Sequence, residues 1–187
     1  MADRLSEYKR KRDLAQTPEP GPRRRRPSRG DPIFVIQQHD ATAMHYDFRL
    51  EVDGVLKSWA VPKGPSTNPA TKRMARPTED HPMEYATFEG VIPKGNYGAG
   101  PVIVWDRGTY RNLSSKSMED GLRRGHISFE LDGDKLQGGW ALTRFRTGKD
   151  ETWLLVKKDD EHANRRGEIT SARPESVSSG RTIDQLT

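Results

Sequence analysis

Residues 44–52 alternate without a break between apolar and polar side chains, and this pattern limits the folds open to the chain more than any other feature. The apolar positions are Met44, Tyr46, Phe48, Leu50 and Val52, and the polar positions are His45, Asp47, Arg49 and Glu51. Because successive side chains of a strand point to opposite faces, the pattern predicts a strand with one buried face and one polar face. Asp53-Gly54 follows directly and is typical of a type I′ hairpin turn, which makes residues 55–61 the return strand.

Further short runs of strand-forming residues recur along the chain, separated by turn residues. They cover residues 34–36, 101–106, 126–131, 140–145 and 153–157. Helical spacing is confined to residues 117–124 and to the end of the chain, where residues 182–185 have capping-box spacing. Many short strands joined by glycine-rich turns predict an all-β fold, an antiparallel barrel or sandwich with one or two short helices.

The excess positive charge is concentrated at the N-terminus. The chain has 187 residues and a net charge of +5, and residues 1–31 hold ten basic and five acidic residues, so the remainder is formally neutral. An arginine run, Arg23, Arg24, Arg25 and Arg26, lies between two prolines. We therefore expect a flexible, disordered basic arm over residues 1–31, a β domain over residues 32–158 and a polar tail or linker over residues 159–187.

Two functions are open to the arginine run. It can be a solubilising tail, or it can be a DNA-binding arm, since guanidinium groups neutralise phosphates and release counterions. Composition favours neither of these interpretations over the other.

The composition also excludes several classes of protein. The chain has no cysteine, which excludes disulfides, thiolate zinc sites and cysteine nucleophiles and fits a reducing cytoplasm. Its longest apolar runs span a few residues, far short of the roughly 20 that a membrane helix needs. The N-terminus lacks the apolar stretch of a secretory signal. We therefore expect a cytoplasmic protein without membrane contact.

The polar face of the strand over residues 44–52 carries residue types that bind metals. His45 and Asp47 share this face roughly 7 Å apart, Arg49 continues the row, and His39 can fold back from the preceding segment. Two imidazoles and a carboxylate with open coordination positions suit a divalent first-row metal such as Mn²⁺ or Zn²⁺. Arg49 beside such a metal indicates an anionic ligand. The alternative is that these side chains are simply solvated, but the second histidine and the apolar opposite face favour the metal site.

Other parts of the chain point less clearly to chemistry. His81 precedes Pro82, which favours an extended conformation, and it can act as acid, base or phosphate donor or form a structural hydrogen bond at a turn. The glycine-rich residues 90–100 lack the Gly-Lys-Ser/Thr of a phosphate-binding P-loop, so a connection between strands is favoured. The residues leave two hypotheses open: metal-assisted phosphoryl chemistry on a nucleic-acid end, or a non-catalytic nucleic-acid binding module that acts through its basic arm.

Several longer motifs resemble one protein family. They are HDATAMHYDFRLE at residues 39–51, GVLKSWAVPKGP at residues 54–65, EDHP at residues 79–82 with Tyr85, FEGVIP at residues 88–93 and YGAG at residues 97–100. These motifs closely resemble the 3′-phosphoesterase domain of bacterial ATP-dependent DNA ligase D. Residues 5–13 and 17–20 look like the leading segment of that domain, and the resemblance runs from about residue 5 to residue 158.

The resemblance implies an all-β, barrel-like domain that repairs 3′ ends for non-homologous end joining. Such domains remove a 3′-terminal ribonucleoside as phosphodiesterases and then the remaining 3′-phosphate as phosphomonoesterases. Their activity depends on a metal, with Mn²⁺ preferred, and Co²⁺ or Zn²⁺ are further candidates. By this resemblance the metal ligands are His39, His45 and Asp47, the catalytic residues are His81, Arg49, Tyr85 and Lys63, and the phosphate-binding residues are Arg49, His81, Arg73 and Gln37.

The resemblance also implies a substrate and partners. The substrate would be a DNA or DNA/RNA 3′ end at a primer-template, and an ATP-dependent DNA ligase, a polymerase and Ku-type end-joining proteins would act on the same ends. We therefore expect a nucleoid-associated monomer. Residues 174–182 resemble the connector that follows this domain in larger ligases, so the chain is either free-standing or one module of a larger protein.

The chain departs from the family pattern at Arg76-Pro77, where relatives have an apolar residue followed by a polar one. Proline lacks the backbone N–H that a strand ladder uses, so this dipeptide predicts an edge or a break in its strand. The placement of the nearby Arg73 depends on which of the two occurs.

Overall fold

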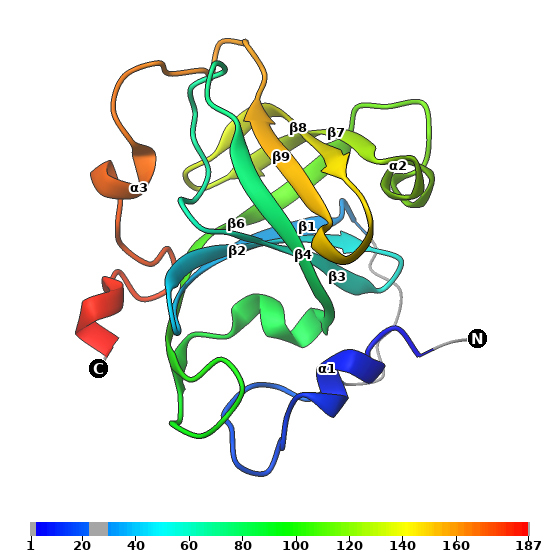
Figure 1. The fold of residues 1–187 in the computed structure, drawn as a ribbon. Coiled ribbons are helices and arrows are strands. Elements are labelled where there is room, and N and C mark those ends of the chain that lie inside the picture. Colours follow the sequence, from blue (N-terminus) through cyan, green and yellow to red (C-terminus); the bar gives the residue numbers. More distant parts are fainter. Residues whose placement is uncertain (1–2, 23–29, 187) are drawn as a thin grey trace.

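The computed structural model describes residues 3–22 and 30–186 and consists mainly of strands (Figure 1). The strands are β1 (Ile33–Asp40), β2 (Met44–Val52), β3 (Val55–Val61), β4 (Arg73–Pro82), β5 (Gly90–Ile92), β6 (Gly100–Asn112), β7 (His126–Gly133), β8 (Gln137–Arg146) and β9 (Thr152–Lys157). The helices are α1 (Ser6–Arg10), α2 (Met118–Arg124) and α3 (Ile169–Ala172), and the 3₁₀ turns are η1 (Met83–Thr87), η2 (Gly148–Asp150) and η3 (Ile183–Leu186). Among the described residues, no helix has the length and apolar character needed to cross a membrane.

Eight of the strands close into a barrel. Their hydrogen-bonded order is β1-β2-β3-β4-β9-β8-β7-β6, and β6 pairs with β1 to complete the ring, while β5 adds to the first residues of β6. All of these pairings are antiparallel. The all-β, barrel-like fold expected from the sequence is therefore confirmed.

The β2–β3 hairpin forms where the alternating pattern predicts it. Both strands have the expected bounds, and Asp53 and Gly54 have positive φ angles of 54° and 82°, as a type I′ turn requires. The apolar side chains of β2, such as Phe48, belong to the core inside the barrel. Its polar residues Asp47 and Arg49 lie on the outer face, and they are buried as well.

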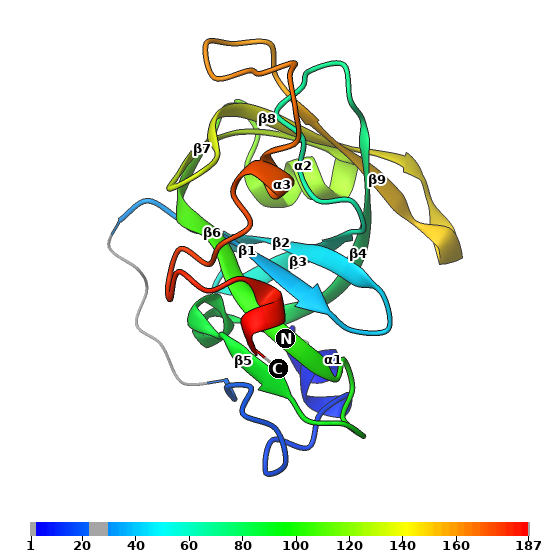
Figure 2. The ribbon, with the colours of Figure 1, turned by 90° about the vertical axis from the view of Figure 1, so that its left-hand side faces the viewer.

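A second apolar cluster covers that outer face. Its members are Tyr8, Val35, Leu56, Met83, Tyr85, Ala86, Phe88, Ile92, Val102 and Val104. They join the outer sides of β1, β3 and β6 to α1, to η1 and to β5. In Figures 1 and 2 the leading segment with α1 (blue) and the β5–β6 loop (green) lie together on this side of the barrel. The polar face of β2 is thus enclosed between the barrel wall and an outer layer.

β4 leaves its neighbour β9 early, and this explains the unusual Arg76-Pro77 dipeptide. β4 pairs with β9 only from Arg73 to Ala75, whereas its pairing with β3 continues to Pro82. Among the described pairings, Pro77 therefore lies where one side of β4 has no strand partner. A residue without a backbone N–H is tolerated at such an edge. Of the two outcomes that the sequence left open, an edge or a break, the structure has the edge, and the strand is continuous.

The described parts of the N-terminal and C-terminal segments pack on the barrel. Tyr8 of α1 is fully buried, and its hydroxyl donates a hydrogen bond to Pro20 O. At the other end, Trp105 Nε1 and Lys135 Nζ donate hydrogen bonds to Arg173 O at 2.8 and 2.9 Å. The three-part division of the chain remains a prediction. Residues 3–22 pack on the barrel and differ in this from the expected flexible arm, because Tyr8 and Glu19 are buried and Arg12 pairs with Glu79.

Candidate functional site

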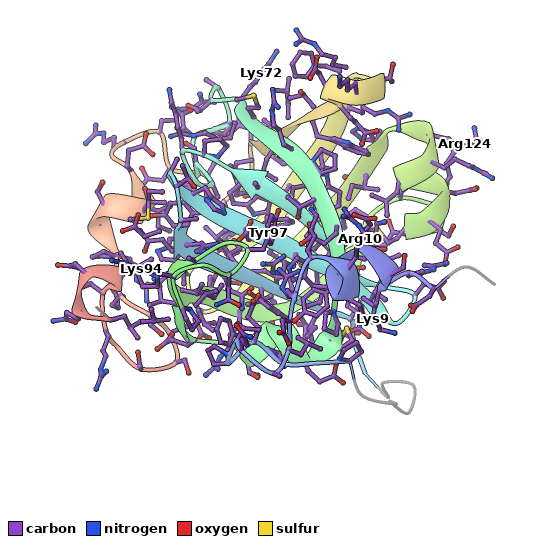
Figure 3. All side chains as sticks on the ribbon, turned by 60° about the horizontal axis from the view of Figure 1, so that its bottom comes forward. Lys9, Arg10, Lys72, Lys94, Tyr97 and Arg124 are labelled. Carbon is purple, nitrogen blue, oxygen red and sulfur yellow. The ribbon has the colours of Figure 1, made fainter. Side chains whose placement is uncertain are left out.

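The polar face of β2 forms one wall of a cavity of about 420 Å³ on the outer side of the barrel. The β1–β2 turn, β4, the β5–β6 loop and the residues after α1 supply the other walls. Figure 3 views the molecule from this side, with Tyr97 on the β5–β6 loop and Arg10 on α1. The cavity therefore lies between strands that form the barrel and segments that cover it.

His39, His45 and Asp47 meet at one end of this cavity. One ligand atom from each lies within 4.8 Å of the other two, and these three residues are the one such group found among the described residues. His45 Nε2 is 3.3 Å and His39 Nδ1 is 3.6 Å from Asp47 Oδ2. The β1–β2 register explains the cluster, because His39 lies directly opposite His45 across the ladder.

Two backbone carbonyls set the orientation of both imidazoles. His39 Nε2 lies 2.6 Å from Gly98 O, and His45 Nδ1 lies 3.0 Å from Ala43 O. A carbonyl only accepts, so we assign the ring proton to these nitrogens. The opposite nitrogens, each with a lone pair, then face the Asp47 carboxylate. Three donor atoms that converge without a proton between them fit a divalent cation, and the carbonyl contacts are of the kind that orient histidine ligands.

Asp47 provides the negative charge of this cluster. Burial by itself would raise the pKa of its carboxyl, but the surrounding groups, first of all the charge of Arg49, outweigh burial and hold that pKa well below its usual range. For His45, burial lowers the pKa, and the contact with Asp47 more than offsets this and raises it. Asp47 is thus an anion at neutral pH.

Arg49 lies next to the cluster and is fixed on several sides. Its Nε donates to Gln37 Oε1 at 2.7 Å, its Nη1 donates to Ser58 Oγ at 2.9 Å, and its Nη2 is 3.4 Å from Asp47 Oδ2. The Gln37 amide donates to the carbonyls of Tyr85 and Phe88, which fixes its orientation. Gln37 therefore lies behind Arg49 and holds it, and it does not line the cavity.

His81 comes from β4 and faces the same cavity beside Arg49. Its Nδ1 lies 2.9 Å from Glu79 O and 3.1 Å from Arg49 Nη1, and its Nε2 lies 3.3 Å from Arg12 Nη2. Burial, and then the positive charges of Arg49 and Arg12, lower the pKa of His81 well below its ordinary value. His81 is therefore neutral at pH 7 when no anion lies against it.

Arg12, which follows α1, places a second arginine beside His81, and the sequence patterns did not identify it. Its Nε donates to Glu19 Oε2 at 2.8 Å, its Nη1 donates to Glu79 Oε1 at 3.1 Å, and its guanidinium lies 4.0 Å from the centroid of the Tyr8 ring. Both carboxylates are buried. The family resemblance of residues 5–13 was the signal that could have pointed to Arg12.

The other residues implied by the resemblance lie in different places. Tyr85 lines the cavity, but its hydroxyl donates to Glu19 Oε2 at 2.7 Å and is buried, which raises its pKa well above the ordinary value. Arg73 forms two hydrogen bonds with Glu168 at 2.7 and 2.8 Å and does not line the cavity. Lys63 is exposed in the turn after β3 and does not line it either.

The arginine run, Arg23, Arg24, Arg25 and Arg26, lies outside the described residues. Its proposed contact with DNA therefore remains a prediction from the sequence. The structure brings together His39, His45, Asp47, Arg49, His81 and Tyr85 at one cavity, with Gln37 directly behind them.

A comparison with known protein families finds a match over the part of the chain that contains most of this cavity. The family model described as the DNA ligase D 3′-phosphoesterase domain matches residues 37–144, which include the His39, His45 and Asp47 cluster, Arg49 and His81. This stretch covers more than half of the chain. It does not include residues 3–22, from which Arg12 comes.

Curated relatives extend the match to most of the chain. A multifunctional non-homologous end joining protein LigD from Pseudomonas aeruginosa is 54% identical over 96% of this chain and 22% of its own length. The multifunctional non-homologous end joining DNA repair protein LigD of Mycobacterium tuberculosis is 52% identical over 77% of the chain and 19% of its own length. The LigD of Mycolicibacterium smegmatis is 41% identical over 94% of the chain. The chain thus spans about a fifth of the length of the curated relatives that it matches.

Proposed function

Because the chain belongs to the DNA ligase D 3′-phosphoesterase domain family, we propose that it is a metal-dependent hydrolase that heals the 3′ ends of DNA before end joining. Its phosphodiesterase step removes a 3′-terminal ribonucleoside, and its phosphomonoesterase step removes the 3′-phosphate that remains. The product is a 3′-OH on a primer-template. A DNA ligase, a polymerase and Ku-type proteins would act on the same ends.

The observation that carries this proposal is the pairing of two chemically different walls in one cavity. One wall holds His39, His45 and Asp47, a donor set for a divalent cation. The other wall holds Arg49, Arg12 and His81. A phosphate ester is an anion that metals and guanidinium groups both bind, and it would satisfy both walls at once.

The metal would be held by His39 Nδ1, His45 Nε2 and Asp47 Oδ2. We propose Mn²⁺, with Co²⁺ or Zn²⁺ as further candidates, because two imidazoles and a carboxylate suit all three. When bound, such a metal supplies Lewis-acid stabilisation of the phosphoryl oxygens and an activated water.

The remaining steps belong to side chains of this chain. Arg49 is held by Gln37 and Ser58, so it meets the phosphate already oriented and without loss of side-chain freedom. An anionic phosphate beside Arg12 and Arg49 offsets the charges that depress the pKa of His81. His81 can then bind the phosphate or donate a proton to the leaving oxygen.

The test is a primer-template that ends in a single 3′-ribonucleotide, incubated with Mn²⁺ or with EDTA. We expect first a product with a 3′-phosphate and then a product with a 3′-OH, both only with Mn²⁺. Binding of the DNA without either product, at any divalent metal, would contradict the proposal and favour a non-catalytic binding module.

A further inference from the structure

Tyr97 stands out among the residues that line the cavity. It lies on the β5–β6 loop, and 49% of its surface is exposed, whereas the other lining tyrosine, Tyr85, is 2% exposed. Figure 3 shows Tyr97 on the side of the molecule where α1 and the β5–β6 loop lie. The proposed function assigns no role to this ring.

The loop that carries Tyr97 is fixed to the metal-binding wall. The next residue, Gly98, accepts the hydrogen bond from His39 Nε2, and Gly98 has a φ of 73°, which favours glycine. At Gly100, a Cβ atom would lie 1.9 Å from Asp40 O, so only glycine allows the loop to approach the end of β1 this closely. The position of the Tyr97 backbone is therefore set relative to His39.

The Tyr97 side chain is also held from the leading segment. Lys11 Nζ donates to the Tyr97 hydroxyl at 3.3 Å and lies 4.7 Å from the ring centroid, and the Arg12 guanidinium lies 5.5 Å from that centroid. Nearly half of the side chain nevertheless remains accessible. An aromatic ring that is held in place and exposed at a cavity mouth is a suitable surface for stacking.

Tyr97 has two kinds of surroundings. The cations beside its ring, Lys11 and Arg12, are already paired with the carboxylates of Glu79 and Glu19. Ala41 and Ala43 of the β1–β2 turn line the same cavity, together with Ile92 at the end of β5. A retained DNA strand carries a charge at every linkage and would need cations along its path. A terminal nucleoside carries no charge beyond the scissile phosphate, so it fits this part of the cavity better.

Building on the proposed function, we infer that Tyr97 is the stacking surface for the base of the terminal nucleoside that the phosphodiesterase step releases. The subsite lies between Tyr97 and the β1–β2 turn, next to the His39, His45 and Asp47 cluster. Its ligand class is a nucleoside joined through its 5′ oxygen to the scissile phosphate. Any base can stack on an aromatic ring. The subsite should therefore bind a terminal nucleoside better than an abasic sugar, whichever base the nucleoside carries.

The experiment compares three substrates on one primer-template. The first ends in adenosine, the second ends in an abasic ribose with the same phosphodiester, and the third ends in a 3′-phosphate. The wild-type protein, Tyr97→Leu and Tyr97→Phe are assayed with Mn²⁺, and kcat and KM are measured separately. Phe145→Leu is the matched control, because Phe145 is also an exposed aromatic residue, at 54%, and does not line the cavity.

We expect the ratio of kcat/KM for the adenosine end to kcat/KM for the abasic end to fall at least about fivefold in Tyr97→Leu, mainly through KM. Tyr97→Phe should keep the wild-type ratio because it keeps the ring, and Phe145→Leu should keep it as well. An unchanged ratio in Tyr97→Leu, or an equal loss on all three substrates, would overturn the inference. Failure of the wild-type protein to cleave any of the three substrates would instead contradict the proposed function.

Discussion

The two walls of the cavity are built in different ways. The metal-binding wall comes from one hairpin, because His39, His45 and Asp47 lie within nine residues of each other on β1 and β2. The other wall, called here the cation wall after its two arginines, joins three distant segments, since Arg12 follows α1, Arg49 is in β2 and the neutral His81 is in β4. A local register creates the first wall, whereas packing of the leading segment on the barrel completes the second.

The two walls also differ in the groups that hold their side chains in place. The imidazoles of the first wall are oriented by backbone carbonyls, Gly98 O and Ala43 O. Arg12 on the second wall is held by the side chains of Glu19 and Glu79, which are buried carboxylates. We therefore expect metal binding to depend on the hairpin and the β5–β6 loop, while phosphate binding depends on the leading segment. The following predictions test this separation.

The largest effect is expected from loss of a metal ligand. His45→Ala should lower both phosphoesterase activities by about a thousandfold or more, because a bound metal supplies several kcal/mol of charge stabilisation. Rates with saturating Mn²⁺ on both substrates, together with Mn²⁺ affinity by titration calorimetry, check this. His126→Ala is the control, since His126 contacts Thr143 at 2.8 Å and lies outside the cavity. Near-wild-type turnover of His45→Ala would show that the metal site is assigned wrongly.

A smaller loss of activity is expected from a substitution on the cation wall. This substitution tests whether the two walls act independently. Arg12→Ala should lower turnover about a hundredfold, as is common when one positioned donor to a developing charge is removed. Mn²⁺ affinity should stay close to that of the wild-type protein. Arg10→Ala is the control within the same segment, because among residues 3–22 and 30–186 Arg10 pairs with Glu7 alone, in an exposed ion pair at 2.7 Å.

The Arg12 variant should also lose stability, because Glu19 and Glu79 would remain buried with one partner fewer. Thermal unfolding measures this, and activity should be compared below the midpoint of the variant. Loss of Mn²⁺ binding in a folded Arg12→Ala protein would show that the two walls are not independent.

The convergence of His45, Asp47 and Arg49 on one face could be predicted from the sequence, whereas the position of Arg12 could not. The alternation of residues 44–52 fixes which side chains share a face, so His45, Asp47 and Arg49 follow from local pattern. Arg12 has no such pattern. Its role depends on α1 packing on β4 through Tyr8 and His81, whose ring centroids are 5.1 Å apart, a contact between residues 73 positions apart in the chain.

The strands show the same difference, because some are predicted by adjacent residues and others depend on distant pairing partners. β2, β3 and their turn follow from alternation and from Asp53-Gly54, which are features of adjacent residues. β4 has a mixed sequence with a proline at its centre and exists because β3 and, over three residues, β9 pair with it. The resemblance supplied Gln37 and Arg73 as phosphate-binding residues, and only the packed structure shows Gln37 behind Arg49 and Arg73 paired with Glu168.

The depressed pKa of His81 gives the cation wall a pH dependence of its own. Burial, Arg49 and Arg12 resist protonation of His81 in the folded state, while the Glu79 carbonyl and carboxylate face it from its own strand. Unfolded His81 takes up a proton as the pH falls below about 6.5, so the wild-type protein should lose stability in that range.

Melting temperatures of metal-free wild type and His81→Ala at pH 7.5 and pH 5.5 check this prediction. The metal ligands titrate in both proteins, whereas only the wild-type protein has His81. The difference in melting temperature between wild type and His81→Ala should therefore narrow at pH 5.5. A narrowing of a few degrees corresponds to about 1 kcal/mol in a chain of this size. A difference that does not change with pH would contradict the depressed pKa. On the two substrates, His81→Ala should slow both reactions, and unchanged rates on both would remove His81 from the site.

The smallest effect on turnover is expected from the arginine run, which lies outside the described residues and adds four positive charges to the chain. Replacing Arg23, Arg24, Arg25 and Arg26 by serine should weaken DNA binding and reduce the slope of log affinity against log salt by as much as about 3 to 4, because each lost phosphate contact changes it by about 0.9 on duplex DNA. Turnover at saturating DNA should remain, since the described residues that line the cavity are unchanged. Arg12→Ala should show the opposite behaviour, with low turnover that added DNA does not restore. If saturating DNA fails to restore turnover in the serine variant, the arginine run contributes to catalysis and is more than a non-specific phosphate contact.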